Sequence, residues 1–243
     1  MQENTKQFVR CDGRTCTQVR PLSLRYDPFG YGAASALFEI GLTKVFVSVT
    51  LQESVPFFLK KSGLGWLTAE YAMLPTATRT RTTREAEQGK KHGRNVEIAR
   101  MIGRCLRSVL NYKDIGERTI QIDCDVLQAD GGTRAACLTA ASYVLERALA
   151  LWHERGLISP KVTLRPLVAL SAGMVANQLM VDLTQKEDNS ASADMTFVMT
   201  REGDIVEVQG TGEERPIPWA SVVALRELVV IAAQPLFDLA EEK

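Results

Sequence analysis

The stretch TIQIDCDVLQADGGTR, residues 119–134, decides the fold of this chain. Apolar side chains alternate with polar ones from Ile120 to Val126, which predicts a strand with one apolar face. A glycine pair follows, and the small and apolar residues from Ala135 to Trp152 predict a closely packed helix. Strand, glycine turn and helix therefore form the central unit of the predicted fold.

The turn Asp130-Gly-Gly-Thr-Arg134 has the chemistry of an anion site. Glycines let backbone N–H groups come close to a ligand, and the start of the helix adds unpaired N–H groups and the positive end of the helix dipole. Thr133 adds a hydroxyl, and Arg134 adds a planar cation that matches phosphate oxygens. Gly132, Thr133 and Arg134 are therefore candidates to bind orthophosphate. An ordinary tight turn before a helix is an equally good interpretation of the spacing.

A second anion site is predicted at Gly93-Arg94. Apolar residues recur at helical spacing from Val96 to Leu110, which predicts an amphipathic helix of about five turns. Arg94 would lie at its N-terminus, where an anion is favoured. The alternative is a solvated arginine beside a glycine turn.

Acidic residues form a third group, Glu187-Asp188 followed by Asp194. We expect Asp188 in a loop and Asp194 at the start of a strand. Two carboxylates that lie together can hold Mg²⁺ or share a proton, and a cation there would offset charge on a phosphodiester. A solvated acidic turn is the alternative interpretation.

Basic residues gather in the segment before the helix predicted at residues 96–110, with Arg79, Arg81 and Arg84 set among threonines. This composition suits contacts with a nucleic-acid backbone, although a solvated basic loop fits as well. Residues 52–93 contain few long apolar runs, so we expect a long irregular segment there.

The remaining patterns predict an α+β fold in which helices pack on mixed sheets, formed by a single domain that spans residues 1–243. Residues 1–10 are expected to be a mobile arm. Strands are predicted at Ser35–Glu39, Lys44–Thr50, Val162–Met174, Gln178–Leu183, Asp194–Thr200 and Ile205–Val208, and a last helix at Trp219–Leu239, broken near Pro235.

The overall composition is that of an ordinary globular protein. Its 29 basic residues balance its 29 acidic ones, so net charge gives no indication of nucleic acid binding. The five cysteines form no C-x-x-C pair, and we interpret them as free thiols in a reducing compartment. The N-terminus lacks an apolar signal region, and no stretch reaches roughly 18 consecutive apolar residues. We therefore expect a cytoplasmic protein with no membrane partner.

Several motifs, in this order along nearly the whole chain, resemble the ribonuclease PH family. They are Arg10-Cys-Asp-Gly-Arg14, Gly65-Trp-Leu-Thr-Ala-Glu-Tyr-Ala-Met-Leu-Pro75, Gly93-Arg-Asn-Val-Glu-Ile98, residues 123–134 of the central unit, Glu187-Asp188, Asp194-Met195 and Val206-Glu-Val-Gln-Gly-Thr211.

The resemblance implies a fold with a duplicated βαβα core and a phosphate-dependent 3′→5′ exoribonuclease. Phosphate would attack the terminal linkage of RNA and release a nucleoside diphosphate, with the 3′ extension of precursor transfer RNA as the usual substrate and DNA not expected as one. Arg94, Gly132, Thr133 and Arg134 would bind phosphate, and Arg81 and Arg84 would guide the RNA. Asp188 and Asp194 would be the catalytic acids and hold Mg²⁺. The chain would form a homohexamer, a trimer of dimers.

Four residues depart from the family pattern: Ala34, Thr76, Ala135 and Asn189. Thr76 stands where an arginine is common, which would weaken an RNA contact rather than the chemistry. Two other functions fit parts of the pattern. A non-catalytic ring subunit would have lost the phosphate or acid residues, which are present here. A relative of polynucleotide phosphorylase would need a second core and added RNA-binding domains.

Overall fold

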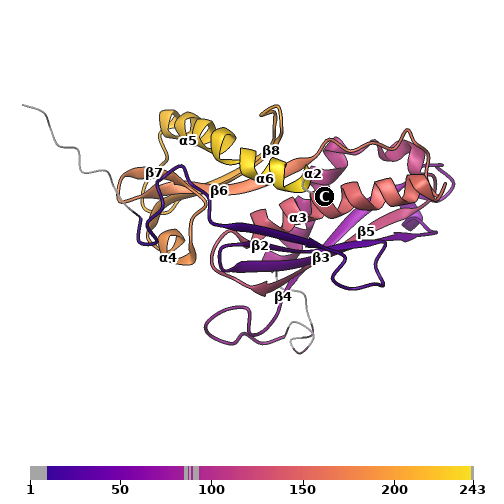
Figure 1. The fold of residues 1–243 in the computed structure, drawn as a ribbon, viewed down its shortest axis with the longest axis horizontal. Helices are drawn as coiled ribbons and strands as arrows, with labels where there is room; N and C mark the ends of the chain where they lie inside the picture. Colours follow the sequence, from indigo (N-terminus) through magenta and orange to yellow (C-terminus); the bar gives the residue numbers. More distant parts are fainter. Residues whose placement is uncertain (1–9, 85–86, 88, 90–92, 242–243) are drawn as a thin grey trace, which may run out of the picture.

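The computed structural model describes residues 10–84, 87, 89 and 93–241, which form two sheets with helices packed between and around them (Figure 1). The first sheet has the order β1-β2-β3-β5-β4, and the second has the order β7-β6-β8-β9. All neighbouring strands are antiparallel except β4 and β5, which are parallel. The α+β prediction is confirmed.

The first sheet contains β1 (Leu22–Tyr26), β2 (Ala34–Ile40), β3 (Thr43–Gln52), β4 (Trp66–Met73) and β5 (Thr119–Gln128). Helix α2 (Gly93–Val109) connects the parallel strands β4 and β5, as a parallel pair requires a crossover. The short 3₁₀ helices η1 (Phe57–Leu59) and η2 (Tyr112–Ile115) lie in the connections on either side of β4 and α2.

The second sheet contains β6 (Leu167–Val175), β7 (Gln178–Val181), β8 (Ala191–Thr200) and β9 (Ile205–Gly212). The four-residue helix α4 (Gln185–Asp188) lies between β7 and β8. Helices α5 (Trp219–Ala232) and α6 (Gln234–Glu241) follow β9. They separate at Ala233, as Pro235 predicts, because proline cannot donate a hydrogen bond inside a continuous helix.

Helix α3 (Thr133–Glu154) lies between the sheets and contacts β2, β3 and β5 of the first and β6 of the second. Its buried residues fall on almost every side, so it lacks the single apolar stripe of a surface helix. Two of its hydroxyls accept hydrogen bonds from backbone N–H groups of strand β6: Ser142 from Leu167 at 2.8 Å, and Thr139 from Ala169 at 2.9 Å. The strand contacts and these two bonds together fix α3 relative to both sheets.

Several local predictions were wrong. Residues 52–93 are not irregular throughout, because β4 alternates buried Leu67, Ala69 and Tyr71 with more exposed residues and pairs with β5. The strand predicted from Val162 begins at Leu167 instead.

The third error concerns Arg10, which was assigned to a mobile arm. Its side chain is fully buried and paired with Glu187. The rest of that arm, residues 1–9, lies outside the described residues.

The segment Trp219–Glu241 is long and apolar enough to cross a membrane: an 18-residue window within it has a mean hydropathy of 1.6, and a third of that window is buried in the protein. It comprises α5 and α6, whose buried residues Leu225, Val229, Leu236 and Phe237 belong to the main hydrophobic core. A core-packed pair of helices meets the same length and composition test, so this segment gives only weak support for a membrane span.

Candidate active site

A cleft of about 600 Å³ opens where the start of α3 meets the second sheet. Its polar lining comes from five elements and the loop after β9: Arg94 and Glu97 of α2, Arg134 of α3, Asp188 of α4, Asp194 and Thr196 of β8, Gln209, Gly210 and Thr211 of β9, and Glu213. Four residues predicted from the sequence, Arg94, Arg134, Asp188 and Asp194, thus line one cleft although up to 100 positions separate them.

The glycine turn precedes Arg134, but neither Gly131 nor Gly132 lines this cleft. Its backbone adopts angles that are costly for residues other than glycine. Gly131 and Gly132 have φ angles of 82° and 67°, in the left-handed region. A Cβ on Gly131 would lie 2.4 Å from the Leu183 carbonyl oxygen and 2.8 Å from the Gln185 nitrogen. The turn therefore packs backbone to backbone against the start of α4, and only glycine allows this approach.

Thr43, the first residue of β3, holds the turn from the other side. Its buried hydroxyl accepts a hydrogen bond from the Asp130 N–H at 3.0 Å and donates one to the Gly131 carbonyl at 2.8 Å. These two bonds fix the direction in which the backbone enters α3.

Thr133 lies behind the turn, outside the lining of the cleft. Its hydroxyl accepts a hydrogen bond from the Tyr71 hydroxyl at 3.0 Å. Burial raises the pKa of Tyr71, so this phenol stays a neutral donor. Gly132 is the N-cap of α3, and the first N–H groups of a helix have no partner within it. Backbone N–H groups at this position suit an anion better than the Thr133 hydroxyl does.

Asp188 is the last residue of helix α4, so its assignment to a loop was wrong. Thr184 and Glu187 form a capping box: the Thr184 hydroxyl accepts from the Glu187 N–H, and the Glu187 carboxylate accepts from the Thr184 N–H at 2.9 Å. The motif Thr-x-x-Glu was visible in the sequence and could have located this helix. The Glu187 carboxylate forms part of this cap, so of the two neighbouring acids it is Asp188 that lines the cleft.

Asp194 lies within β8, where it pairs with Gly173 of β6 and Thr211 of β9. Burial, and next the charge of Asp188, raise the pKa of Asp194 to about 6. Burial also raises the pKa of Asp188, although Arg94 and Arg134 act in the opposite direction. The four side chains therefore interact electrostatically across one cleft.

Gln209, which sequence reasoning did not single out, is the hydrogen-bond partner of Arg134. Its side-chain oxygen accepts from Arg134 Nη1 at 2.8 Å, and its amide nitrogen donates to Glu207 at 2.9 Å. Gln209 and Gly210 belong to the motif of residues 206–211, whose role could not be inferred because only the fold brings β9 beside α3.

Arg81 and Arg84 are exposed in the connection between β4 and α2, and neither lines the cleft. The structure therefore does not bring these two predicted RNA contacts into the group formed by Arg94, Arg134, Asp188 and Asp194.

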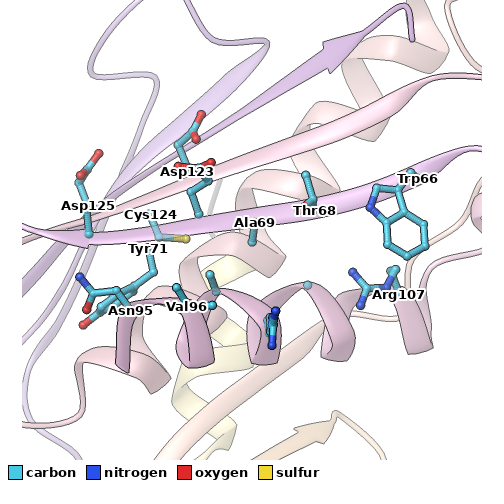
Figure 2. A pocket seen from close by; sticks show the side chains of 15 residues that line it. Trp66, Thr68, Ala69, Tyr71, Asn95, Val96, Arg107, Asp123, Cys124 and Asp125 are labelled. Atoms are coloured by element: carbon cyan, nitrogen blue, oxygen red, sulfur yellow. The ribbon is translucent and has the colours of Figure 1, made fainter. Parts of the chain in front are cut away.

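A second hollow, of about 520 Å³, lies between β4 and α2 and contains none of the predicted site residues (Figure 2). Its Arg107 already donates to the Leu67 carbonyl at 2.8 Å and stacks 4.6 Å from the centre of the Trp66 ring. Burial raises the pKa of Asp123 and of Asp125 on the neighbouring strand. Arg100 also lines this hollow, but its acidic side chains, Glu70, Asp123 and Asp125, make it a poor phosphate site.

Comparison with known proteins defines the class. Residues 18–149 match domain 1, and residues 165–223 match domain 2, of the 3′ exoribonuclease family RNase PH, so the chain belongs to this family.

Individual relatives carry the same name. The protein named Ribonuclease PH of Corynebacterium kroppenstedtii is 47% identical over 206 residues, which cover 85% of this chain and 81% of the relative. The protein of that name from Moorella thermoacetica is 44% identical over 242 residues, which cover 96% of each chain.

Solved structures share the fold at low sequence identity. Rice Rrp46 has a TM-score of 0.78 at 16% identity and covers 96% of this chain and 99% of its own. A chain of the Archaeoglobus fulgidus exosome, solved with RNA bound to the active site, has a TM-score of 0.77 at 20% identity and covers 95% of this chain and 92% of its own.

Asp194→Asn should stabilise the protein above about pH 6 in the absence of divalent cations. The folded-state pKa of Asp194 is raised above its ordinary value of 3.8, so ionisation of this carboxyl opposes folding progressively between about pH 4 and pH 6 and to its full extent above about pH 6. Below about pH 4 the carboxyl is protonated in both states, and the stability difference from the variant should vanish. A gain of up to about 2 kcal/mol at pH 7–8 is expected after solvent screening.

Urea unfolding at several pH values, in chelator, measures this difference. Ser192→Ala, a neighbouring change on the same strand, is the control. A gain that is independent of pH would contradict the explanation from Asp194 ionisation.

Proposed function

We propose that the cleft between α3 and the second sheet is the place where this chain uses orthophosphate to shorten RNA. The protein is a phosphate-dependent 3′→5′ exoribonuclease of the ribonuclease PH family, whose role is to trim the 3′ ends of precursor transfer RNA. One observation carries the assignment of the site: two arginines, Arg94 and Arg134, and two carboxylates, Asp188 and Asp194, line the same cleft at the start of a buried helix.

Orthophosphate would lie between Arg94 and Arg134, with the backbone of Gly132 and Thr133 at the start of α3. Guanidinium groups form paired, charge-assisted hydrogen bonds with phosphate oxygens, and the helix start adds N–H donors. The hydrogen bonds of Thr43 and Tyr71 hold this end of α3 in place before phosphate arrives. Such preorganisation lowers the cost of orienting the attacking group.

In phosphorolysis an oxygen of phosphate attacks the phosphorus of the last linkage. A new P–O bond forms, the bond to the 3′ oxygen of the preceding nucleotide breaks, and a nucleoside diphosphate leaves. The released 3′ oxygen needs a proton. When Asp194 is not a cation ligand it can supply this proton, because in the metal-free cleft a pKa of about 6 keeps part of its population protonated near neutral pH. Asp188 raises that pKa, as one carboxyl of an acidic pair does for the other.

We also propose that Asp188 and Asp194 hold Mg²⁺, which would offset negative charge on the reacting phosphates when it is bound. Among residues 10–84, 87, 89 and 93–241, no group of three or more His, Cys, Asp or Glu side chains has the arrangement of a metal site. Two carboxylates nevertheless fit this ion, because Mg²⁺ is commonly held by one or two carboxylates together with substrate phosphates and water. The repulsion between Asp188 and Asp194 is what a bound cation would relieve.

RNA would enter with its 3′ end in the cleft, while Arg81 and Arg84 contact the backbone further along the strand. Both side chains are exposed, as contacts with a flexible polyanion require. We propose RNA rather than DNA as the substrate, a single catalytic domain over residues 1–243, and a cytoplasmic location.

The chain should release nucleoside diphosphates from a 3′-extended transfer RNA only when phosphate is present. Arg134→Ala should lower kcat/KM for phosphate by about 10²-fold or more, because it removes a charge-assisted contact with the attacking group. Arg155→Ala, at the opposite end of α3, is the matched control and should change it less than about twofold.

Product analysis by chromatography, with and without phosphate, decides the reaction type. Release of nucleoside monophosphates in phosphate-free buffer would show hydrolysis instead and would refute the proposal.

Millimolar Mg²⁺ should raise the Tm of the wild-type protein at pH 7.5 by a few degrees and should leave Asp194→Asn unchanged. A ligand that binds only the folded state stabilises it by mass action, and the variant lacks one of the two carboxylates. Differential scanning fluorimetry measures both shifts, with Na⁺ at equal ionic strength as the control. Equal Mg²⁺ shifts in the two proteins would exclude Asp194 as a ligand.

We propose that the chain assembles as a homohexamer, a trimer of dimers. Large apolar side chains at the surface support subunit contacts: Trp219 and Ile231 on α5 are 77% and 69% exposed, and Phe57 in η1 is 88% exposed. Light scattering should give six times the chain mass of 26.8 kDa. A monomer at micromolar concentration would contradict this assembly.

A further inference from the structure

Three arginines near the N-terminus, Arg10, Arg14 and Arg20, are buried in the protein, with side-chain exposures of 0%, 7% and 5%. Two buried carboxylates, Asp182 and Glu187, face them. Burial of charges opposes folding unless each group is paired and hydrogen-bonded, and apolar residues of similar volume often do as well or better. This cluster therefore points to a role other than bulk stability.

Arg20 connects the glycine turn to the second sheet. Its guanidinium donates to both carboxylate oxygens of Asp182, at 2.7 and 3.0 Å, and to the carbonyls of Asp130 at 2.5 Å and Gly131 at 3.4 Å. Asp182 directly follows β7. One planar side chain thus holds the turn before α3 at a set position relative to the end of β7.

Arg10 holds the helix that carries Asp188. Its guanidinium donates to both oxygens of the Glu187 carboxylate, at 2.7 and 2.5 Å, and to the carbonyls of Val181 and Asp182, each at 2.7 Å. Glu187 caps α4 and is adjacent to Asp188. A four-residue helix is not stable alone, so its orientation depends on contacts such as these.

The glycine turn, held by Arg20, and helix α4, held by Arg10, are in direct contact. The close approach of Gly131 to Leu183 and Gln185 leaves no room for a side chain between the turn and α4. Asp182 joins the two anchors: its carboxylate accepts from Arg20, and its carbonyl accepts from Arg10. Its backbone has a φ of 52°, which is unusual for a residue other than glycine, and the surrounding bonds hold it there.

We propose that Arg10 and Arg20 are positioning residues that set the geometry between the phosphate turn Asp130–Gly132 and the acid-bearing helix α4. Arg20 acts on the attacking phosphate through the turn, and Arg10 acts on Asp188 through Glu187. The inference rests on the proposed site, in which these two parts bind phosphate and carry a catalytic acid.

The two arginines should give different kinetic defects. Arg20→Gln should raise the KM for phosphate about tenfold or more with a smaller change in kcat. Arg10→Gln should lower kcat about tenfold or more and change the phosphate KM less than about threefold, since small displacements of reacting groups cost large factors in rate. Steady-state phosphorolysis of a short RNA at varied phosphate measures both constants.

Arg14→Gln is the matched control. Arg14 belongs to the same buried cluster and donates to Asp182 at 3.1 Å, but it makes no hydrogen bond to the turn, and its nearest Glu187 oxygen is 3.8 Å away. It should lower the Tm by a similar amount and change both kinetic constants less than about threefold. Kinetic losses in Arg10→Gln and Arg20→Gln that match those of Arg14→Gln would overturn the proposal.

Two further variants complete the test. If a glutamine variant fails to fold, Arg10→Lys or Arg20→Lys replaces it, because lysine keeps the charge but cannot donate to both carboxylate oxygens in the same plane. The split between KM and kcat should persist, and its absence counts against the proposal.

Arg134→Ala separates this inference from the proposed site. A normal phosphate KM in Arg134→Ala would show that the site itself is misplaced. A raised KM in Arg134→Ala together with unaltered Arg10 and Arg20 variants would refute the positioning role alone.

Discussion

The burial of α3 between two sheets is the constraint on which the rest of the structure depends. Because α3 is enclosed on most sides, the chain can reach it only at one of its ends. The chain therefore turns sharply after β5 to begin α3. The glycine pair makes that turn, and its left-handed backbone brings the turn into contact with the start of α4. The cleft lies at this meeting point because it is where the N-terminus of the central helix is accessible.

Local patterns predicted the parts of the fold whose cause is local. The alternation before Asp130 and the small residues after Arg134 specified β5 and α3, and Pro235 marked the separation of α5 from α6. Strand β4 was missed because its alternation is short and lies within a segment rich in threonine and basic residues. Helix α4 was missed because four residues give no periodicity, although Thr184 and Glu187 form its capping box.

The candidate site was predictable residue by residue but not as an arrangement. Arg94, Arg134, Asp188 and Asp194 carry distinctive chemistry, and the structure brings them to one cleft. The partners that fix them are remote in sequence. Arg10 and Glu187 are 177 positions apart, and Arg20 and Asp182 are 162 apart, so no local pattern could pair them. Thr133 was correctly placed at the turn, but its hydroxyl is turned toward Tyr71 and away from the cleft.

The bond between Arg134 and Gln209 has a consequence for ligand exchange. The guanidinium donates a hydrogen bond to a neutral amide, whereas its interaction with Asp188 and Asp194 is electrostatic. An anion that bound to Arg134 would displace a neutral acceptor, which costs less than breaking a hydrogen-bonded ion pair in a partly buried site. The hydrogen bond to this amide would favour one orientation of the Arg134 side chain before an anion binds. An acidic residue at position 209 would hold Arg134 more tightly and would compete with every anion that enters.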